Sequence, residues 1–398
     1  MKYIVLLGDG MSDKKLDELG GKTPLQVAMT PHMDYMAKRG RMGLARTVPE
    51  GYAPGSDVAN LSVFGYDPRT CYTGRSPLEA ASIGVELGPD DVAFRVNLVH
   101  LHPHGGKIFM QDYSAGHISD GEGKELLMAL QDELGNEEFQ FYPGVGYRHL
   151  MVWRGGEDRM TVTPPHDITG QEVAEYLPRG EGAERLIYLM NASQMVLCNH
   201  PQYKKRATDN KLPANSVWFW GQGKAPKMVS YRERFGLTGA VISAVDLIRG
   251  IGVYAGLEIV KVEGATGYVN TNYRGKADAA LTALEKVDYV YLHVEAPDEA
   301  SHSGNLQEKI TAIERFDEMV VGPILAGIEK LGAYRILCMP DHPTPVKLMT
   351  HTAAPVPFII YSGETEEKPL QSGYDEESAK ATGLTLDDGF RLMEILMT

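Results

Sequence analysis

The stretch YRILCMPDHPTPVKLMTHTAAPVPFIIY, residues 334–361, decides the fold. Its first apolar run stops just before the adjacent pair Asp341 and His342, and His351 follows before a second apolar run begins. Short apolar runs of this kind predict buried strands, and open α/β sheets carry their chemistry at the carboxyl ends of such strands. Carboxylate and imidazole groups bind hard and borderline cations. The stretch therefore predicts a strand that ends in a functional site.

The same pattern recurs at two other places in the chain. The apolar run 3–7 ends just before Asp9, and the run 287–294 is followed by Asp298 and His302. The spacing of four residues puts the last two side chains on one face of a helix. A lone Asp after a strand is usually a turn residue or a helix cap. The prediction of a metal site therefore depends on Asp or His residues following all three apolar runs. Six side chains of ligand type, enough for two metal ions, are thus expected at one sheet edge: Asp9, Asp298, His302, Asp341, His342 and His351.

The segment PGSDVANLS, residues 54–62, places Ser56 at the expected N-terminus of a helix. Backbone N–H groups and the helix dipole at such a position favour a phosphoryl group or an alkoxide. Taken alone, Ser56 is most simply a helix cap. Next to a two-metal site it becomes a candidate nucleophile, because a metal-bound hydroxyl loses its proton readily.

Length and composition limit the classes of function. A chain of 398 residues predicts one large α/β domain with a second, smaller one. A net charge of −14 argues against general nucleic-acid or anionic-membrane binding. The three cysteines are scattered and odd in number, which indicates a reducing compartment without a disulfide framework. With no visible signal peptide and no apolar run approaching about 18 residues, we expect a cytoplasmic protein with no membrane partner.

Strand and helix patterns divide the chain into a core and an insertion. Residues 1–71 and 211–398 alternate strand and helix, which predicts a mostly parallel sheet flanked by helices. Residues 72–210 mix amphipathic strands with helices and predict an inserted, smaller α+β domain. We expect strands at 92–99, 147–153 and 160–162 and helices at 24–39, 119–134, 181–197 and 306–331.

Eight motifs distributed over the chain are specific enough to suggest a family. They are LLGDGMSD (6–13), PEGYAPGSDVANLSVFGYDP (49–68), TGRSPLEAASIGVEL (73–87), DVAFRVNLV (91–99), PANSVWFWGQG (213–223), VEGATGYVNTNYRGKADAAL (262–281), HVEAPDEASHSG (293–304) and MPDHPTP (339–345). With them the chain resembles, over nearly its whole length, the archaeal-type cofactor-independent (2,3-bisphosphoglycerate-independent) phosphoglycerate mutases of the alkaline phosphatase superfamily.

The resemblance implies a role for each matching residue in an alkaline-phosphatase-like core. Ser56 would be the nucleophile that carries a transient phosphoryl group. One divalent cation would be held by Asp9, Asp341, His342 and the Ser56 oxygen, and the other by Asp298, His302 and His351. Mixed carboxylate and imidazole ligands suit Mn²⁺ or Zn²⁺ better than an all-oxygen Mg²⁺ site. Mn²⁺ is the expected ion, with Zn²⁺ and Mg²⁺ as alternatives, and 2,3-bisphosphoglycerate is not required.

The implied reaction interconverts 3-phosphoglycerate and 2-phosphoglycerate, so the partner is a small phosphorylated carboxylate. The inserted domain, residues 72–210, would be the substrate-binding cap. Arginine suits both charged groups of such a substrate because its planar fork binds oxyanions through paired hydrogen bonds. His166 and Asp167 are candidates for proton transfer or for orienting the substrate. The candidate substrate-binding residues are Arg75, Arg95, Asn97, Arg148, His166, Asp167 and Arg206.

Three other functions stay open. The segments DYSAGHIS (112–119), TPPHDITG (163–170) and HPQYKKRATDN (200–210) resemble a sub-branch of the family proposed to act as a homoserine kinase. The same metal core also suits a phosphatase or phosphodiesterase. A catalytically silent metal-binding protein would not need Ser56 beside a full set of ligands. No phosphate-binding loop for ATP is complete, because Leu16 stands where the glycine preceding Gly21-Lys22-Thr23 is required, which favours the mutase.

Overall fold

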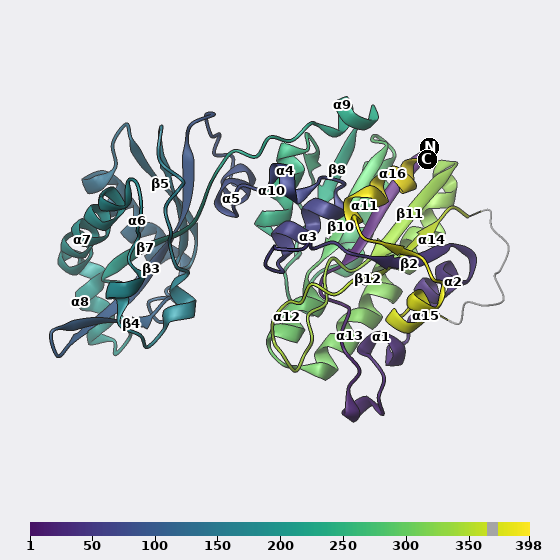
Figure 1. The fold of residues 1–398 in the computed structure, drawn as a ribbon, viewed down its shortest axis with the longest axis horizontal. Helices are drawn as coiled ribbons and strands as arrows, with labels where there is room; N and C mark the ends of the chain where they lie inside the picture. Colours follow the sequence, from purple (N-terminus) through teal and green to yellow (C-terminus); the bar gives the residue numbers. More distant parts are fainter. Residues whose placement is uncertain (364–372) are drawn as a thin grey trace. The chain divides into compact units, whose positions relative to one another are not determined.

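The computed structural model describes residues 1–363 and 373–398 and divides into two compact units. Unit 1 comprises Met1–Tyr72 and Lys227–Thr398, and unit 2 comprises Thr73–Pro226 (Figure 1). Unit 2 is therefore an insertion between two parts of unit 1. The chain returns to unit 1 at 226–227 rather than at the predicted 210–211, because β7 (Ser216–Lys224) pairs antiparallel with β3 (Val92–His104) inside unit 2.

Unit 1 is built on an eight-stranded sheet in the order β13-β2-β12-β11-β1-β10-β8-β9. At its centre β1 (Lys2–Gly8) lies between β10 (Tyr289–Val294) and β11 (Tyr334–Met339), and all three strands are parallel. These are the continuous apolar runs of the sequence, as expected for strands covered on both faces. The α/β fold class predicted from the sequence is confirmed. The other strands are β2 (Arg41–Ala45), β8 (Gly239–Ile242), β9 (Glu258–Ile259), β12 (Val356–Tyr361) and β13 (Thr385–Leu386).

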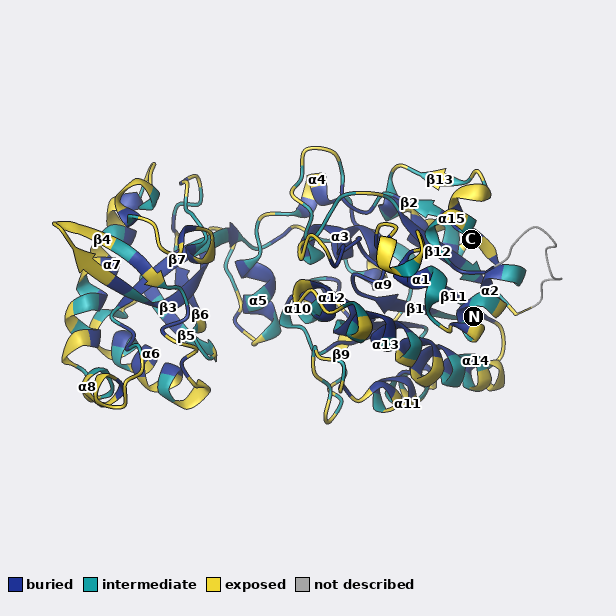
Figure 2. Ribbon diagram, turned by 90° about the horizontal axis from the view of Figure 1, so that it is seen from below, coloured by how far each residue is buried: buried dark blue, intermediate teal, exposed yellow. Residues whose placement is uncertain are grey.

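Helices cover both faces of this sheet, and its strands are largely buried (Figure 2). Alternate side chains of β10 point to the two faces of the sheet: Val290 and Leu292 join the larger core, whereas Tyr291 stacks on Phe64 at 3.8 Å between ring centroids. The helices that contribute to the larger core include α2 (Pro31–Arg39), α11 (Tyr273–Leu284), α13 (Leu306–Phe316) and α14 (Gly322–Ile328). Others in contact with the sheet or with one another are α3 (Ser56–Val63), α10 (Asp246–Tyr254) and α16 (Leu392–Met397).

Of the two helices predicted in unit 1, one is interrupted in the structure and the other forms as predicted. The helix expected over 24–39 is two helices, α1 (Pro24–Val27) and α2, because Pro31 lacks the N–H needed to continue a helix and forces Thr30 out of the helical region. The helix expected over 306–331 runs as predicted through α13, a π-helical turn and α14 to Gly332. The remaining short elements are Asp17–Leu19, α4 (Pro68–Cys71), α9 (Tyr231–Phe235), α12 (Ala296–His302), Asp317–Val321, Glu329–Leu331, α15 (Glu376–Ala381) and Gly389–Arg391.

Unit 2 is an antiparallel five-stranded sheet with helices and a separate hydrophobic core. Its strands run in the order β4-β3-β6-β5, and β7 also pairs with β3. The strand expected at 160–162 is only an isolated bridge between Thr161 and Arg179. The remaining elements are α5 (Ser76–Ser82), β4 (Lys107–Asp112), α6 (Asp120–Leu134), β5 (Phe139–Val145), β6 (Arg148–Trp153), Pro165–Ile168, Val173–Tyr176, α7 (Ala183–Asn199) and α8 (Pro201–Thr208).

A search of the described residues for membrane-spanning helices finds none that is both long enough and apolar enough.

Candidate active site

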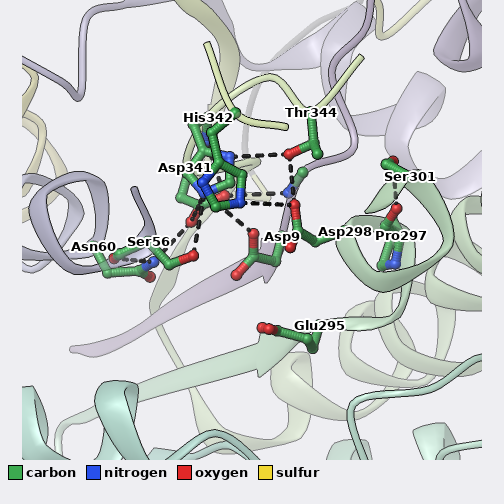
Figure 3. Close-up of polar contacts among 12 residues, drawn as sticks. Asp9, Ser56, Asn60, Glu295, Pro297, Asp298, Ser301, Asp341, His342 and Thr344 are labelled. Carbon is green, nitrogen blue, oxygen red and sulfur yellow. Dashed lines mark hydrogen bonds and ion pairs between the residues drawn. The ribbon is translucent and has the colours of Figure 1, made fainter. Parts of the chain in front are cut away.

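The carboxyl ends of the three central strands bring the predicted ligands together. Asp9 directly follows β1, Asp341 follows β11 after one proline, and Asp298 lies in α12, which begins just after β10. Because the strands are parallel and in register, with Gly8 opposite Val294, their carboxyl ends meet at one edge of the sheet. Figure 3 shows the resulting cluster of side chains.

One group of ligand atoms is formed by Asp9, Asp341 and His342, which are fully buried. His342 Nε2 lies 3.2 Å from Asp341 Oδ2 and 3.6 Å from Asp9 Oδ1. The same nitrogen is 3.2 Å from Ser56 Oγ, the first residue of α3. The candidate nucleophile is therefore in direct contact with a candidate metal ligand.

A second group is centred on Asp298. Its Oδ2 lies 3.1 Å from His302 Nε2, and its Oδ1 lies 3.5 Å from His351 Nε2. The two histidine Nε2 atoms are 2.9 Å apart. His302 Nδ1 is 3.0 Å from the carbonyl oxygen of Met349, whose left-handed φ of 52° aims that carbonyl at the ring. The Nδ1–H group donates to that carbonyl, so Nε2 is the nitrogen that could bind a cation, in exchange for its own proton. The structure thus gathers all six predicted ligands and Ser56 at one site.

The electrostatics of the site reflect four crowded carboxylates. Burial raises the pKa of Asp9 well above its ordinary value, and the negative charges of Asp341, Glu295 and Asp298 raise it further. Burial also works against ionised Asp298, but hydrogen bonds with His302 and a second histidine hold its pKa well below the ordinary value. The same contact with Asp298 raises the pKa of His302 to about 9.

These residues fit a divalent cation. Asp9 Oδ1 is buried and accepts no hydrogen bond within the described part of the chain. The ion pairs found there for Asp9, Asp298 and Asp341 are with histidines rather than with lysine or arginine. Buried negative charge of this kind requires compensation, and mixed carboxylate and imidazole donors suit a borderline divalent ion.

Asn60 is a site residue that the sequence did not single out. Its Nδ2 donates to Asp341 Oδ2 and to the carbonyl oxygen of Ser56, both at 2.8 Å. Its Oδ1 accepts from the Tyr291 hydroxyl at 2.5 Å. The sequence did offer one signal for Asn60: it lies one helical turn after Ser56, between the apolar residues Ala59 and Leu61. Asn60 ties the helix that carries the candidate nucleophile to a candidate metal ligand.

His293 is a second residue that the sequence reasoning missed. Its Nε2 lies 2.8 Å from Asp9 Oδ2, and its Nδ1 lies 3.1 Å from Ser243 Oγ. An ionised Asp9 oxygen can only accept, so Nδ1 is the nitrogen without a hydrogen, and it accepts from the Ser243 hydroxyl, whose oxygen also accepts the Val245 N–H. The ring proton is then on Nε2, which donates to Asp9. Although Glu295 is near enough to complete a third group of ligand atoms, His293 orients Asp9 instead of offering a lone pair.

In unit 2, Arg75, Arg95 and Arg148 form a positively charged group. Glu79 pairs through its two oxygens with Arg75 Nε at 3.1 Å and with Arg95 Nε at 3.0 Å. The Arg95 guanidinium lies 4.3 Å from the centre of the Trp220 ring. Burial lowers the pKa of Arg95 to about 10, and the positive charges of Arg75 and Arg148 also act in that direction. Three cations with one paired carboxylate predict affinity for an anion.

Asn97 and His166 both contact Trp220, which stacks on Arg95 of this group. Trp220 Nε1 donates to Asn97 Oδ1 at 2.9 Å, and Asn97 Nδ2 donates to the Tyr113 carbonyl at 3.0 Å. The amide of Asn97 therefore positions Trp220. The His166 ring is 5.3 Å from the Trp220 ring, and its Nε2 lies 3.5 Å from an exposed oxygen of Asp167.

Arg206 belongs to a different network. It is buried, and its three nitrogens donate to the Leu212 carbonyl at 3.0 Å, to Glu122 at 2.9 Å and to the Ala115 carbonyl at 2.7 Å. With every nitrogen used inside the fold, Arg206 holds α8 against the start of α6. The expectation that it binds substrate is replaced by this structural role.

Comparison with known proteins agrees with the motifs and the geometry. The family model "2,3-bisphosphoglycerate-independent phosphoglycerate mutase" matches residues 37–203. A probable 2,3-bisphosphoglycerate-independent phosphoglycerate mutase from Geobacter sulfurreducens is 72% identical over 397 residues, covering 100% of both chains. The enzyme of that name from Methanosarcina barkeri is 52% identical over 399 residues, covering 100% of this chain and 99% of its own.

A solved structure extends the likeness to three dimensions. The cofactor-independent phosphoglycerate mutase from Thermoplasma acidophilum superposes with a TM-score of 0.69 at 26% identity, covering 100% of this chain and 99% of that one. Since the likeness spans both units and the full length of the relatives, the chain belongs to the 2,3-bisphosphoglycerate-independent phosphoglycerate mutases.

Proposed function

We propose that this protein interconverts 3-phosphoglycerate and 2-phosphoglycerate through a phosphoserine at Ser56. The observation that carries the proposal is the 3.2 Å contact between Ser56 Oγ and His342 Nε2, in a cluster of buried carboxylates and imidazoles. Ser56 opens α3, and the dipole at a helix N-terminus favours a phosphoryl group. The relatives that carry the mutase name span the full chain.

Two divalent cations, Mn²⁺ in the first instance, complete the proposed site. Asp9, Asp341, His342 and Ser56 would hold one of them, and Asp298, His302 and His351 the other. When bound, the cations would stabilise the negative charge on the attacking and leaving oxygens of a phosphoryl transfer.

The proposed reaction has two half-reactions that balance each other. Ser56 Oγ, having lost its proton, bonds to phosphorus while the bond from phosphorus to O3 of the substrate breaks, and O3 takes up one proton. In the second half, O2 of the retained glycerate loses a proton and bonds to phosphorus while the bond to Ser56 breaks, and the serine oxygen regains a proton. Neither ATP nor 2,3-bisphosphoglycerate enters this balance.

Unit 2 is the proposed source of substrate recognition. Arg75, Arg95 and Arg148 would bind the carboxylate through the paired hydrogen bonds that a guanidinium offers. Trp220 stacks on Arg95 and fixes the plane of that guanidinium. Burial lowers the pKa of His166, which keeps its ring neutral at pH 7. His166 can therefore accept one proton and return it, as the exchange between O2 and O3 requires.

A comparison of substrates tests the proposal. The purified protein with Mn²⁺ would receive 3-phosphoglycerate without ATP, homoserine with ATP, or p-nitrophenyl phosphate. We expect 2-phosphoglycerate from the first mixture and mass spectrometry to detect a phosphorylated peptide containing Ser56. Phosphorylation of homoserine without isomerisation would instead identify a kinase, and release of phosphate alone a phosphatase.

Ser56→Ala tests the nucleophile. We expect isomerisation to fall to background while the far-ultraviolet circular dichroism spectrum stays unchanged. Ser301→Ala is the matched control, because that buried serine donates only to a carbonyl of its own helix, at 2.7 Å from Pro297 O, and its variant should keep normal turnover. Full turnover by Ser56→Ala would remove Ser56 from the mechanism.

A further inference from the structure

Thr344 lies between the two groups of candidate metal ligands. Its Oγ1 is 2.5 Å from Asp298 Oδ1, which belongs to one group, and 3.2 Å from His342 Nδ1, which belongs to the other (Figure 3). Thr344 is fully buried and follows β11 in the same loop as Asp341 and His342. His342 is also near enough to Asp298 and His351 to form a group with them. With His342 assigned to the Asp9 group, as in the proposed function, one hydroxyl group contacts a ligand of each cation.

The two contacts fix where the hydrogens are. A hydroxyl carries a single hydrogen, and a carboxylate can only accept. The Thr344 hydrogen consequently points at Asp298, and the contact with His342 must be a donation from Nδ1–H to Oγ1. The lone pair of His342 is then on Nε2, the atom that faces Ser56, Asp341 and Asp9. Thr344 sets both the tautomer and the direction of this ring.

The backbone holds Thr344 in this position. Its N–H donates to the Ser12 carbonyl at 3.1 Å, and its own carbonyl accepts from the buried Lys309 ammonium at 2.9 Å. Lys309 also donates to the Ser12 carbonyl at 3.2 Å and pairs with Asp13 at 2.9 Å. The loop after β11 and the loop after β1 are thus joined through the Lys309 ammonium. The backbone from which the Thr344 hydroxyl extends is therefore held in place.

Gly10 closes the remaining space around the hydroxyl. A Cβ at this glycine would lie 2.7 Å from Thr344 Oγ1 and 2.5 Å from Asp298 Oδ1, so no side chain fits there. Gly10 N–H in turn donates to Asp341 Oδ1 at 3.2 Å. The Thr344 hydroxyl is enclosed by ligands and by the backbone of the first loop.

We propose that Thr344 is a positioning residue that couples the two cation sites, so that filling one increases the affinity of the other. A cation bound at the Asp298 group fixes the carboxylate that receives the Thr344 hydrogen. The hydroxyl lone pair then stays directed at His342 Nδ1–H, and Nε2 stays available to the second cation. By linkage the second cation favours the first to the same extent. This inference rests on the two-cation site of the proposed function.

Thr344→Val and Thr344→Ser separate the hydroxyl from the shape of the side chain. Valine keeps the volume and removes the hydroxyl, whereas serine keeps the hydroxyl. Calorimetric titration of the metal-free proteins with MnCl₂, with bound metal counted by elemental analysis, gives two affinities for each variant. We expect Thr344→Val to weaken binding of at least one Mn²⁺ by about 10- to 100-fold, the effect typical of removing a hydrogen-bond partner of a metal ligand. Thr344→Ser should stay within about 3-fold of the wild type on the same scale.

Thr311→Val controls for loss of a threonine hydroxyl elsewhere, because Thr311 Oγ1 donates only to a carbonyl in its own helix and the residue is not part of the site. Its affinities should equal those of the wild type. Thermal unfolding of each variant in EDTA checks that the metal-free fold is intact. A wild-type protein that binds two ions, with a folded Thr344→Val variant that binds them equally well, would overturn the coupling alone. A wild-type protein that binds no divalent ion would overturn both the coupling and the two-cation site.

Discussion

Asn60 donates a hydrogen bond to Asp341 across 281 positions of the sequence, with 2.8 Å between Nδ2 and Oδ2. The amide has two hydrogens, and the other serves the carbonyl of Ser56. The residue that carries the proposed phosphoryl group and the carboxylate after β11 are therefore held by one planar group. The position of the proposed nucleophile depends on a side chain that takes no part in the proposed reaction.

Asn60→Asp should lower turnover strongly. The substitution replaces the donating NH₂ with an oxygen 2.8 Å from Asp341 Oδ2, so two carboxylates would face each other in a buried site. We expect kcat to fall by about 10- to 100-fold, as for other residues that orient metal ligands. Steady-state kinetics with 3-phosphoglycerate measure it. Asn136→Asp is the control, since Asn136 uses only its Oδ1, as acceptor for two backbone N–H groups, and Asp preserves both bonds.

Gly10→Ala should damage the site by direct overlap. Gly10 has φ of +62°, and the added Cβ would meet Asp298 and Thr344. Gly20→Ala is matched to it, because Gly20 has φ of +64° but nothing within 4 Å of the added Cβ. Both variants bear the backbone penalty of about 1 kcal/mol for a side chain in the left-handed region. The difference between their Mn²⁺ affinities and turnover numbers therefore reports the overlap, and equal behaviour of the two variants would contradict this account.

Removing the divalent cations should destabilise unit 1 and leave unit 2 largely unchanged. All three tryptophans of the chain, Trp153, Trp218 and Trp220, lie in unit 2. Tryptophan fluorescence therefore follows unit 2, whereas circular dichroism follows both units. A ligand at 100 times its dissociation constant stabilises the folded state by about 2.7 kcal/mol. We expect EDTA to lower the main circular dichroism midpoint and not the fluorescence midpoint, and an equal shift in both would refute the separation.

His149 should make unit 2 sensitive to mild acid. Burial lowers its pKa from the ordinary 6.5 to about 4, and only 2% of its surface is exposed. A depressed pKa means that the unfolded chain binds the proton more tightly. The stabilisation from neutral His149 is therefore complete above pH 6.5 and is lost as the pH falls through 6.5 toward 4. Over that interval the loss amounts to about 3 kcal/mol.

His149→Asn removes this titration and keeps an acceptor for the Gly144 N–H, which now donates to His149 Nδ1 at 3.0 Å. Urea unfolding followed by tryptophan fluorescence at pH 7.5, 6.0 and 4.5 tests the effect. The free energy of unfolding should decline less steeply toward acid in the variant than in the wild type. Parallel pH profiles would show that His149 is already charged or already accessible.

The meeting of the candidate ligands at one site was predictable because of where the strands end. Asp9, Asp298 and Asp341 each follow an apolar run, and in a parallel sheet such positions converge whatever the intervening sequence. The structure therefore brings these residues together, and their role as metal ligands stays a prediction. What the sequence could not supply is the second layer of contacts, such as Asn60 to Asp341 or Thr344 to Asp298, because a hydrogen bond between distant loops leaves no periodicity or spacing.

Arg206 and the return of the chain near 226 show two other limits. Arg206 is a suitable anion ligand by residue type alone, but it is buried and each of its three nitrogens already donates a hydrogen bond within the fold. The segment 216–224 has the composition of a strand, yet composition does not say which sheet it joins. Register against β3 decides that, and it is a property of the folded unit.

The placement of β1 at the centre of its sheet sets an order for events during synthesis. β1 leaves the ribosome first, but both of its neighbours, β10 and β11, are made near the end, and Asp9 contacts His293 across 284 positions. Unit 2 is one continuous stretch of sequence with its own core, so it can fold before the strands that pair with β1 have been synthesised. The candidate site therefore cannot form until the chain has been made as far as His351. A chain released early would carry a finished unit 2 and no working site.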